Sequence, residues 1–402
     1  MRIYTESSEE ALLARKLLKQ WADDGALSKE QYEHLEQDTV SGLRTTNVFL
    51  RLVLFFFTVI VVAAGVGLFF LVFLSHPSEQ TGGITCLIFA AICYAVAEAA
   101  VARAYLYRFG IEEALGVCSV ALFCGGLASL FAGGNNVSPY IAEFLVPAAG
   151  CVLSLWGWYR FGFWYAFPAA MIFALFLPIY WNPSLSEHHV FVAVLYAAGW
   201  ICIAKVRSPH RLDYLNKTYS IAEACLWLGI YLILNLKISA SLAPGQWLFH
   251  SARATSEFAA PFYWTTWVLI WCLPPLVLAR GIRQKDRFVI AVGAILALLT
   301  LVTNKPYLGW QRHTWDPMLL GIALAGVAVF LQRWLAQGPD GVRHGFTAAR
   351  LSAKDKHALN TGAAVLGLLS PQVITPSPQA TGPDFDSGFG GASGGGGASG
   401  DF

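Results

Sequence analysis

Charged residues are scarce in this sequence. Asp, Glu, Lys and Arg make up 13% of its 402 residues and apolar residues make up 56%, whereas about a quarter of the residues in ordinary soluble domains are charged. A chain with so few polar side chains cannot cover a water-soluble globule. The composition therefore excludes a soluble globular protein and predicts that the lipid bilayer is its solvent.

The signatures of the common enzyme and nucleotide-binding classes are also missing. The chain has no P-loop and no H-E-x-x-H, and outside the glycine-rich residues 385–402 it has no G-x-S-x-G and no Rossmann fingerprint. Its basic residues are scattered over the ends of apolar runs instead of forming one patch, so we expect no nucleic-acid partner. These absences favour a protein that is not an enzyme and has no cofactor, and they disfavour ATP-driven transport by this chain alone.

Cysteine motifs are absent as well. The chain has no C-x-x-C, and all eight cysteines fall inside apolar runs. We therefore expect them to be small packing residues, without disulfides or a zinc site.

What the sequence does contain is a series of long apolar runs. Each is close to the roughly twenty residues that cross the hydrocarbon of a bilayer. We predict an all-α membrane bundle of about ten helices, at residues 49–74, 83–102, 111–133, 139–158, 162–181, 188–205, 219–240, 259–279, 287–303 and 316–335.

The distribution of basic residues predicts the orientation of these spans. With the N-terminus inside, 23 of the 27 Lys and Arg fall on the inner side, and only Lys237, Arg253, Lys305 and Arg312 fall outside. Cytoplasmic loops carry such an excess, so we expect both termini in the cytoplasm. A missed span would move every later loop to the wrong side, so the sorting also supports the count.

The two ends of the chain differ from the middle. Capping boxes at Ser7–Glu10 and Ser28–Gln31 predict two helix starts, and Leu13, Leu17 and Trp21 form an apolar stripe on the first helix. We expect four parts, which are a cytoplasmic helical hairpin (1–47), the transmembrane bundle (48–336), a cytoplasmic segment with a short amphipathic helix (337–370) and a disordered Pro/Gly/Ser-rich tail (371–402).

The opening hairpin also resembles a known protein family. Leu17, Leu18, Trp21, Gly25, Leu27, Ser28, Gln31 and Leu35, followed directly by a membrane span, are similar to the N-terminal unit of a family of bacterial polytopic membrane proteins with a domain of unknown function. The resemblance covers about the first seventy positions. It implies a multi-pass protein of the bacterial inner membrane, and it carries over no catalytic residues.

Four acidic residues are the main candidates for an ion or substrate pathway. Glu98 and Glu223 lie in similar Ala-Glu-Ala segments at the inner ends of the second and seventh spans, and Glu112 and Glu113 open the third. An ion in hydrocarbon is costly and is kept where it lines a cavity or meets a partner. The functional interpretation is an inward-facing cluster that binds a cation or proton. The alternative is that these carboxylates lie among headgroups, cap helices or pair with nearby arginines.

A second, weaker candidate is a metal site on the predicted outer side. His188, His189, His250, His313 and Asp316 lie in or beside three loops, and imidazole and carboxylate are suitable metal ligands. Their spacing follows no fixed motif, so solvated loop residues are the alternative interpretation.

Three functions remain open from the sequence. The first is a transporter or permease of a small solute or lipid that uses the intramembrane acids. The second is a structural or regulatory membrane component that recruits cytoplasmic proteins through residues 1–45 or the C-terminal tail. The third is a membrane-embedded enzyme that uses the outer His/Asp group.

Overall fold

The structure is a computed structural model. It describes residues 3–23, 27–39, 42–73, 78–132, 139–181, 184–210, 215–242, 258–310, 313, 315–337, 342–343 and 346–347. The predicted amphipathic helix within 337–370 and the tail from residue 371 lie outside these described residues.

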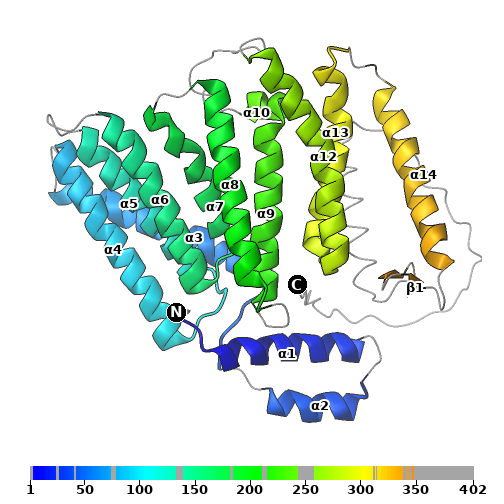
Figure 1. The fold of residues 1–402 in the computed structure, drawn as a ribbon. Coiled ribbons are helices and arrows are strands. Elements are labelled where there is room, and N and C mark those ends of the chain that lie inside the picture. The colour runs from blue at the N-terminus through cyan, green and yellow to red at the C-terminus, as the bar shows by residue number, and fades with distance from the viewer. Residues whose placement is uncertain are drawn as a thin grey trace, which may run out of the picture. The chain divides into compact units, whose positions relative to one another are not determined.

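The chain forms two compact units, the first made of residues 1–15 and 39–313 and the second of residues 16–38 and 314–402. The first unit contains helices α3 (Val48–Phe73), α4 (Glu79–Ala104), α5 (Ile111–Ala132), α6 (Pro139–Phe161), α7 (Ala166–Phe176), η1 (Leu177–Trp181), α8 (Leu185–Arg207), α9 (Asn216–Leu234), α10 (Leu236–Leu242), α12 (Ala260–Gln284) and α13 (Arg287–Tyr307). Figure 1 shows the long helices of this unit side by side.

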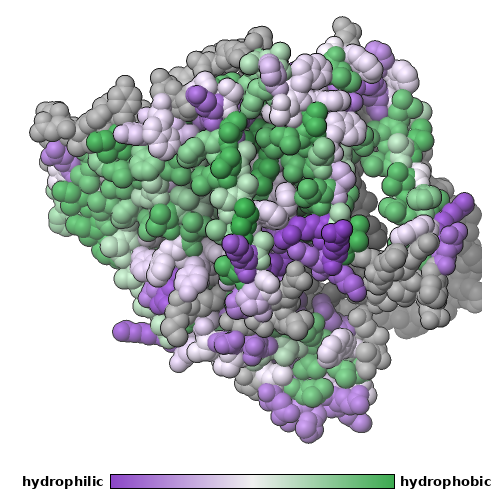
Figure 2. Space-filling view, viewed as in Figure 1, coloured by the Kyte–Doolittle hydropathy of each residue, from purple (hydrophilic) through white to green (hydrophobic). Residues whose placement is uncertain are grey.

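Eight helices of the described chain are long and apolar enough to cross a membrane: α3, α4, α5, α8, α9, α12 and α13, with residues 318–336 of α14. In water an exposed apolar surface of this size would aggregate, whereas in lipid it is the expected outer face. Phe56, Phe57 and Ile60 of α3 are each more than 60% exposed. The helices are therefore compatible with a multi-pass membrane protein. Figure 2 shows green, apolar side chains over the long helices of the first unit.

Two predicted spans are not continuous helices. The run at 162–181 forms the eleven-residue α7 and then the short 3-10 helix η1, where Pro178 lacks the amide that would continue the α-helical ladder. The run at 219–240 breaks at Asn235 between α9 and α10. Hydropathy does not detect either interruption, because the apolar character continues across both.

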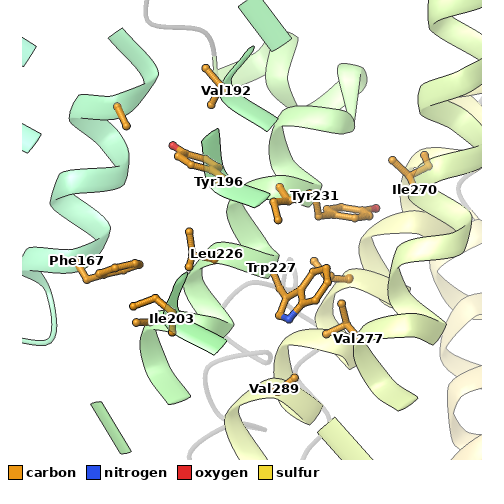
Figure 3. Packing of buried hydrophobic residues seen from close by; sticks show 14 of the residues in the cluster. Phe167, Val192, Tyr196, Ile203, Leu226, Trp227, Tyr231, Ile270, Val277 and Val289 are labelled. Carbon is orange, nitrogen blue, oxygen red and sulfur yellow. The ribbon is translucent and has the colours of Figure 1, made fainter. Parts of the chain in front are cut away.

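Side chains from α7 to α13 form the main core of the first unit. Figure 3 shows Leu226 and Trp227 of α9 within this core, with Ile203 of α8 beside Leu226 and Val277 of α12 beside Trp227. The hydroxyl of Tyr196 donates to the carbonyl of Met171 at 2.6 Å and so joins α8 to α7. This packing holds the predicted inner ends of α8, α9, α12 and α13 together.

Helix α1 (Glu6–Asp23) begins in the first unit and continues into the second, which also contains α2 (Lys29–Asp38), α14 (Asp316–Ala336) and a hairpin of β1 (Val342–Arg343) with β2 (Phe346–Thr347). The capping box at Ser28 and Gln31 is confirmed by reciprocal hydrogen bonds of 3.2 and 3.0 Å.

The other predicted capping box is wrong, because α1 already begins at Glu6. Thr5 precedes the helix instead, and its hydroxyl lies 2.7 Å from that of Ser8. The predicted apolar stripe is half-exposed, since Leu17 and Trp21 have 39% and 49% of their surface accessible.

Candidate functional site

A group of largely buried charged and polar side chains meets at the predicted inner ends of four helices. Arg207 lies at the end of α8, Ser220 and Glu223 near the start of α9, Arg280 near the end of α12, and Asp286 directly before α13. We call these five residues the inner network. Glu223 is completely buried, and Arg207, Ser220 and Asp286 are less than 9% exposed.

Arg207 is the central cation of the inner network. Its Nη1 donates to Oε2 of Glu223 at 2.7 Å, and its Nη2 lies 2.5 Å from Oδ2 of Asp286. Its Nε donates to Oδ1 of Asn216 at 3.1 Å. A planar guanidinium can serve three acceptors in fixed directions, which an ammonium group cannot do in the same way.

Arg280 reaches Glu223 from a different helix. Its Nε donates to Oε1 of Glu223 at 2.5 Å, and its guanidinium lies over the ring of Trp200 at 4.8 Å from the centroid. The indole Nε1 of Trp200 donates to the same carboxylate oxygen at 3.3 Å. Arg280 keeps 28% of its side chain accessible, so it is the most exposed charged group of the inner network.

Asp286 caps helix α13 and also contacts other residues of the inner network. One carboxylate oxygen caps α13 by accepting from the amides of Phe288 at 2.9 Å and Val289 at 3.4 Å. The hydroxyl of Ser220 lies within 2.7 Å of both carboxylate oxygens. The cap therefore fixes an acidic group where α9 and α13 meet.

The charges of the inner network balance. Two guanidinium groups face two carboxylates, and each carboxylate has several donors, which offsets the cost of taking ions out of water. The pairs cross from α8 and α9 to α12 and α13. Separation of these two helix pairs would therefore break the contacts of Arg207 with Asp286 and of Arg280 with Glu223, and only the pair of Arg207 with Glu223 would remain.

The other acidic candidates form separate contacts. Glu98 accepts from Nε of Arg160 at 2.9 Å and from the hydroxyl of Tyr94 at 2.9 Å, which joins α4 to α6. Glu113 pairs with Arg51 of α3, whose Nε donates at 2.7 Å. Glu112 is completely buried, and its Oε1 accepts from the amide of Phe109 at 2.7 Å.

The four acids proposed from the sequence do not share one cluster. Glu98 and Glu223 contact different arginines on different helices, and Glu112 and Glu113 lie at the start of α5. Sequence reasoning did not single out Arg207, Arg280 or Asp286. Both arginines belong to the 23 basic residues that the charge distribution places on the predicted inner side. The one available signal for Asp286 was an acidic residue immediately before an apolar run, which is typical of a helix cap.

Four of the five outer metal-site candidates lie among the described residues. No group of three His, Cys, Asp or Glu side chains that could hold a metal occurs among the described residues. The Nδ1 of His189 lies 2.7 Å from the carbonyl of Leu185, and its Nε2 lies 3.1 Å from the hydroxyl of Ser239. The neighbouring His188 is beside it on α8, His250 lies outside the described residues, and His313 and Asp316 belong to different units.

A second buried polar group surrounds the break in α9. The amide nitrogen of the Asn235 side chain donates to the hydroxyls of Tyr231 and Thr303, both at 3.0 Å. The amide of Leu236 donates to the hydroxyl of Tyr307 at 2.6 Å, which supplies a partner for backbone that the break leaves without one. This group and the inner network therefore lie toward opposite ends of α9.

In comparisons with known proteins, no family model, curated protein or solved structure matched this chain. Any function must therefore be argued from the geometry.

Proposed function

We propose that this protein is a multi-pass transporter of a small solute or lipid in the bacterial inner membrane, with both termini cytoplasmic. The inner network closes the helix group α8, α9, α12 and α13 on the cytoplasmic side. Solute release then requires separation of these helices, with exchange of the ion pairs for contacts with water or solute.

The main support is the complete burial of Glu223 between arginines from two helices. Ionisable groups within membrane helices are costly and are usually retained for a pathway or a switch. A structure that needed only stability would do as well with apolar side chains at these positions, because replacement of a buried ion pair by packed apolar groups is often neutral or stabilising.

The interrupted helix is a second support. Transporters often place substrate near discontinuous helices, where unwound backbone and polar side chains face a cavity. Here the break at Asn235 brings Tyr231, Thr303 and Tyr307 together within the same helix group. We assign the solute-contacting region to this break and the closure to the inner network.

Flux through proteoliposomes tests the proposal. Purified full-length protein is reconstituted, and transport currents are recorded on a solid-supported membrane with a panel of inorganic ions, organic acids, amines and amino acids. We expect at least one solute to give a current that Glu223→Gln reduces strongly. Glu187→Gln is the matched control, because Glu187 lies in an exposed capping box at the other end of α8 and glutamine preserves that motif.

A regulatory or structural role is the second candidate, and one observation favours it. Leu17, Trp21 and Leu35 of the N-terminal hairpin are 38–49% exposed, as expected for a surface that a cytoplasmic protein covers. If cells depend on Leu17 and Trp21 but tolerate Glu223→Gln, and no solute of the panel gives a current, the transport proposal is wrong and this second role is favoured.

A further inference from the structure

Glu112 is a buried carboxyl group with an incomplete set of partners. Its side chain has no solvent exposure. Oε1 accepts the amide hydrogen of Phe109, but Oε2 is buried and has no hydrogen-bond partner among the described residues. A buried charged oxygen without a partner is costly, so such an atom indicates a bound species that neutralises it.

The charges around Glu112 support the same conclusion. The adjacent Glu113 takes Nε and Nη2 of Arg51, so the one guanidinium of this site is already used by another carboxylate. Besides Arg51 and Glu113, the titratable groups around this site are three phenols, Tyr4, Tyr107 and Tyr165, with Glu9 acting on Tyr4. Two carboxylates therefore share one cation, and one negative charge remains to be neutralised.

The N-terminal segment covers this site. The amide of Ile3 donates to the carbonyl of Arg160 at 3.1 Å, and the hydroxyl of Tyr4 donates to the carbonyl of Leu106 at 3.2 Å. The Tyr4 ring is buried and meets the ring of Tyr107 edge-on, with centroids 4.9 Å apart. Burial raises the pKa of the Tyr4 hydroxyl well above its usual range. Tyr4 is therefore a neutral cover at physiological pH.

The backbone around the site is closely fitted. Arg44 exchanges hydrogen bonds with Tyr105 at 2.8 Å and Tyr107 at 3.0 Å, so the segment before α3 and the loop before α5 are joined. Gly110 has a φ of +105°, and a Cβ at this position would lie 2.3 Å from the carbonyl oxygen of Arg51. Only glycine fits here, and the start of α5 is thereby held against α3.

We propose that Glu112 is a proton-binding site and that the N-terminal segment 3–5 is the cover that controls its exchange with water. A proton from solvent forms an O–H bond at Oε2 and returns to solvent when it leaves. The site holds one proton while the segment is docked, and displacement of Tyr4 opens the path to water. This inference does not depend on the transport function proposed above, because its test reads the carboxyl group directly.

Infrared spectroscopy of the full chain in lipid nanodiscs tests the proposal. A protonated carboxylic acid has a carbonyl stretch that a carboxylate lacks. We expect such a band at neutral pH, with a shift when glutamate is labelled with carbon-13. The band should be absent in Glu112→Gln and unchanged in Glu98→Gln, because Glu98 is held as a carboxylate by Arg160. The proposal is overturned if the wild type has no such band, or if the band persists in Glu112→Gln.

Two further measurements separate a proton from a metal cation and test the cover. A carboxylate band that shifts on replacing sodium by a large organic cation, without a protonated-acid band, would assign the site to a metal cation and overturn the proposal. In heavy water, Tyr4→Ala should accelerate deuterium exchange of the Glu112 band several-fold, whereas Tyr4→Phe keeps the ring and should change the rate much less. Equal rates in the wild type and Tyr4→Ala would show that segment 3–5 is not the cover.

Discussion

Arg207 and Arg280 both contact Glu223, but they differ in how many partners they hold. Among the described residues, Arg207 contacts Asn216, Glu223, Gln284 and Asp286, whereas Arg280 donates to Glu223 and lies on Trp200. Removal of one partner from a buried ion pair costs about 3–5 kcal/mol. We expect Arg207→Gln to lower the free energy of unfolding by about this amount, and Arg280→Gln by clearly less, since Arg207 would still neutralise Glu223.

Denaturant unfolding in mixed micelles, followed by circular dichroism, measures this difference. Arg283→Gln is the matched control, because Arg283 is an exposed arginine on the same helix as Arg280. Equal losses for Arg207→Gln and Arg280→Gln would contradict the central position of Arg207.

At the scale of single residues, the sequence identifies an unusual acidic side chain but not its partners. An acid such as Glu223 near the end of an apolar run can be singled out, because its cost in hydrocarbon is known in advance. The partners of Glu223 cannot be identified in the same way, because Arg207 and Arg280 lie on other helices. Hydropathy does not show which helices pack together or which of their faces meet. Glu112 and Glu113 illustrate the same problem, since adjacent residues of one type have different surroundings.

At the scale of helices, Gly126 permits the close contact between α4 and α5. A Cβ at Gly126 would lie 2.8 Å from the carbonyl oxygen of Gly83, whereas one at the adjacent Gly125 would meet nothing within 4 Å. Gly126→Ala should therefore destabilise the protein by about 1–3 kcal/mol through overpacking. Gly125→Ala should be neutral or stabilising, because alanine is the better helix former by about 1 kcal/mol.

Thermal unfolding of the two single variants in the same lipid checks this prediction. Both changes have the same effect on helix propensity, so the difference between them isolates the packing of α5 against α4. If both variants have the same unfolding temperature, the close approach at Gly83 and Gly126 is not important for stability.

Helices were more predictable than their interruptions. Every predicted span overlaps a helix, because in lipid the backbone must satisfy its hydrogen bonds within the segment. The breaks at Pro178 and Asn235 were missed for different reasons. Pro178 is tolerated within an apolar run and carries no hydropathy signal. The break at Asn235 depends on Tyr307 from α13, a partner that the local sequence does not reveal.

At the scale of the whole chain, the proposed orientation can be checked by labelling. Trp310 lies in the predicted outer loop between α13 and α14, and Arg283 lies at the predicted inner end of α12. Each is replaced singly by cysteine, as Trp310→Cys or Arg283→Cys, in a variant without native cysteines. Trp310 is 64% exposed. A membrane-impermeant maleimide added to intact cells should label Trp310→Cys, and should label Arg283→Cys only after the cells are opened. The reverse pattern would place the inner network outside.

The charge distribution predicts that orientation because each basic residue is costly to move across the bilayer. It does not predict how the helices are grouped. The grouping of α8, α9, α12 and α13 depends on contacts such as Ser220 with Asp286, which join positions distant in the sequence.

A reversible cross-link across the inner network tests the central claim most directly. Ser220 and Asp286 are in side-chain contact at 2.6 Å, so Ser220→Cys with Asp286→Cys, in a variant without other cysteines, should join α9 to the start of α13 when oxidised. Because the two substitutions also remove members of the inner network, the comparison is made within this variant. With a solute found by the flux panel, we predict no flux in the oxidised protein and, after reduction, a flux that is measurable but lower than that of the wild type. Equal flux in the oxidised and reduced states would contradict the account, because solute would then cross while the proposed closure stays locked.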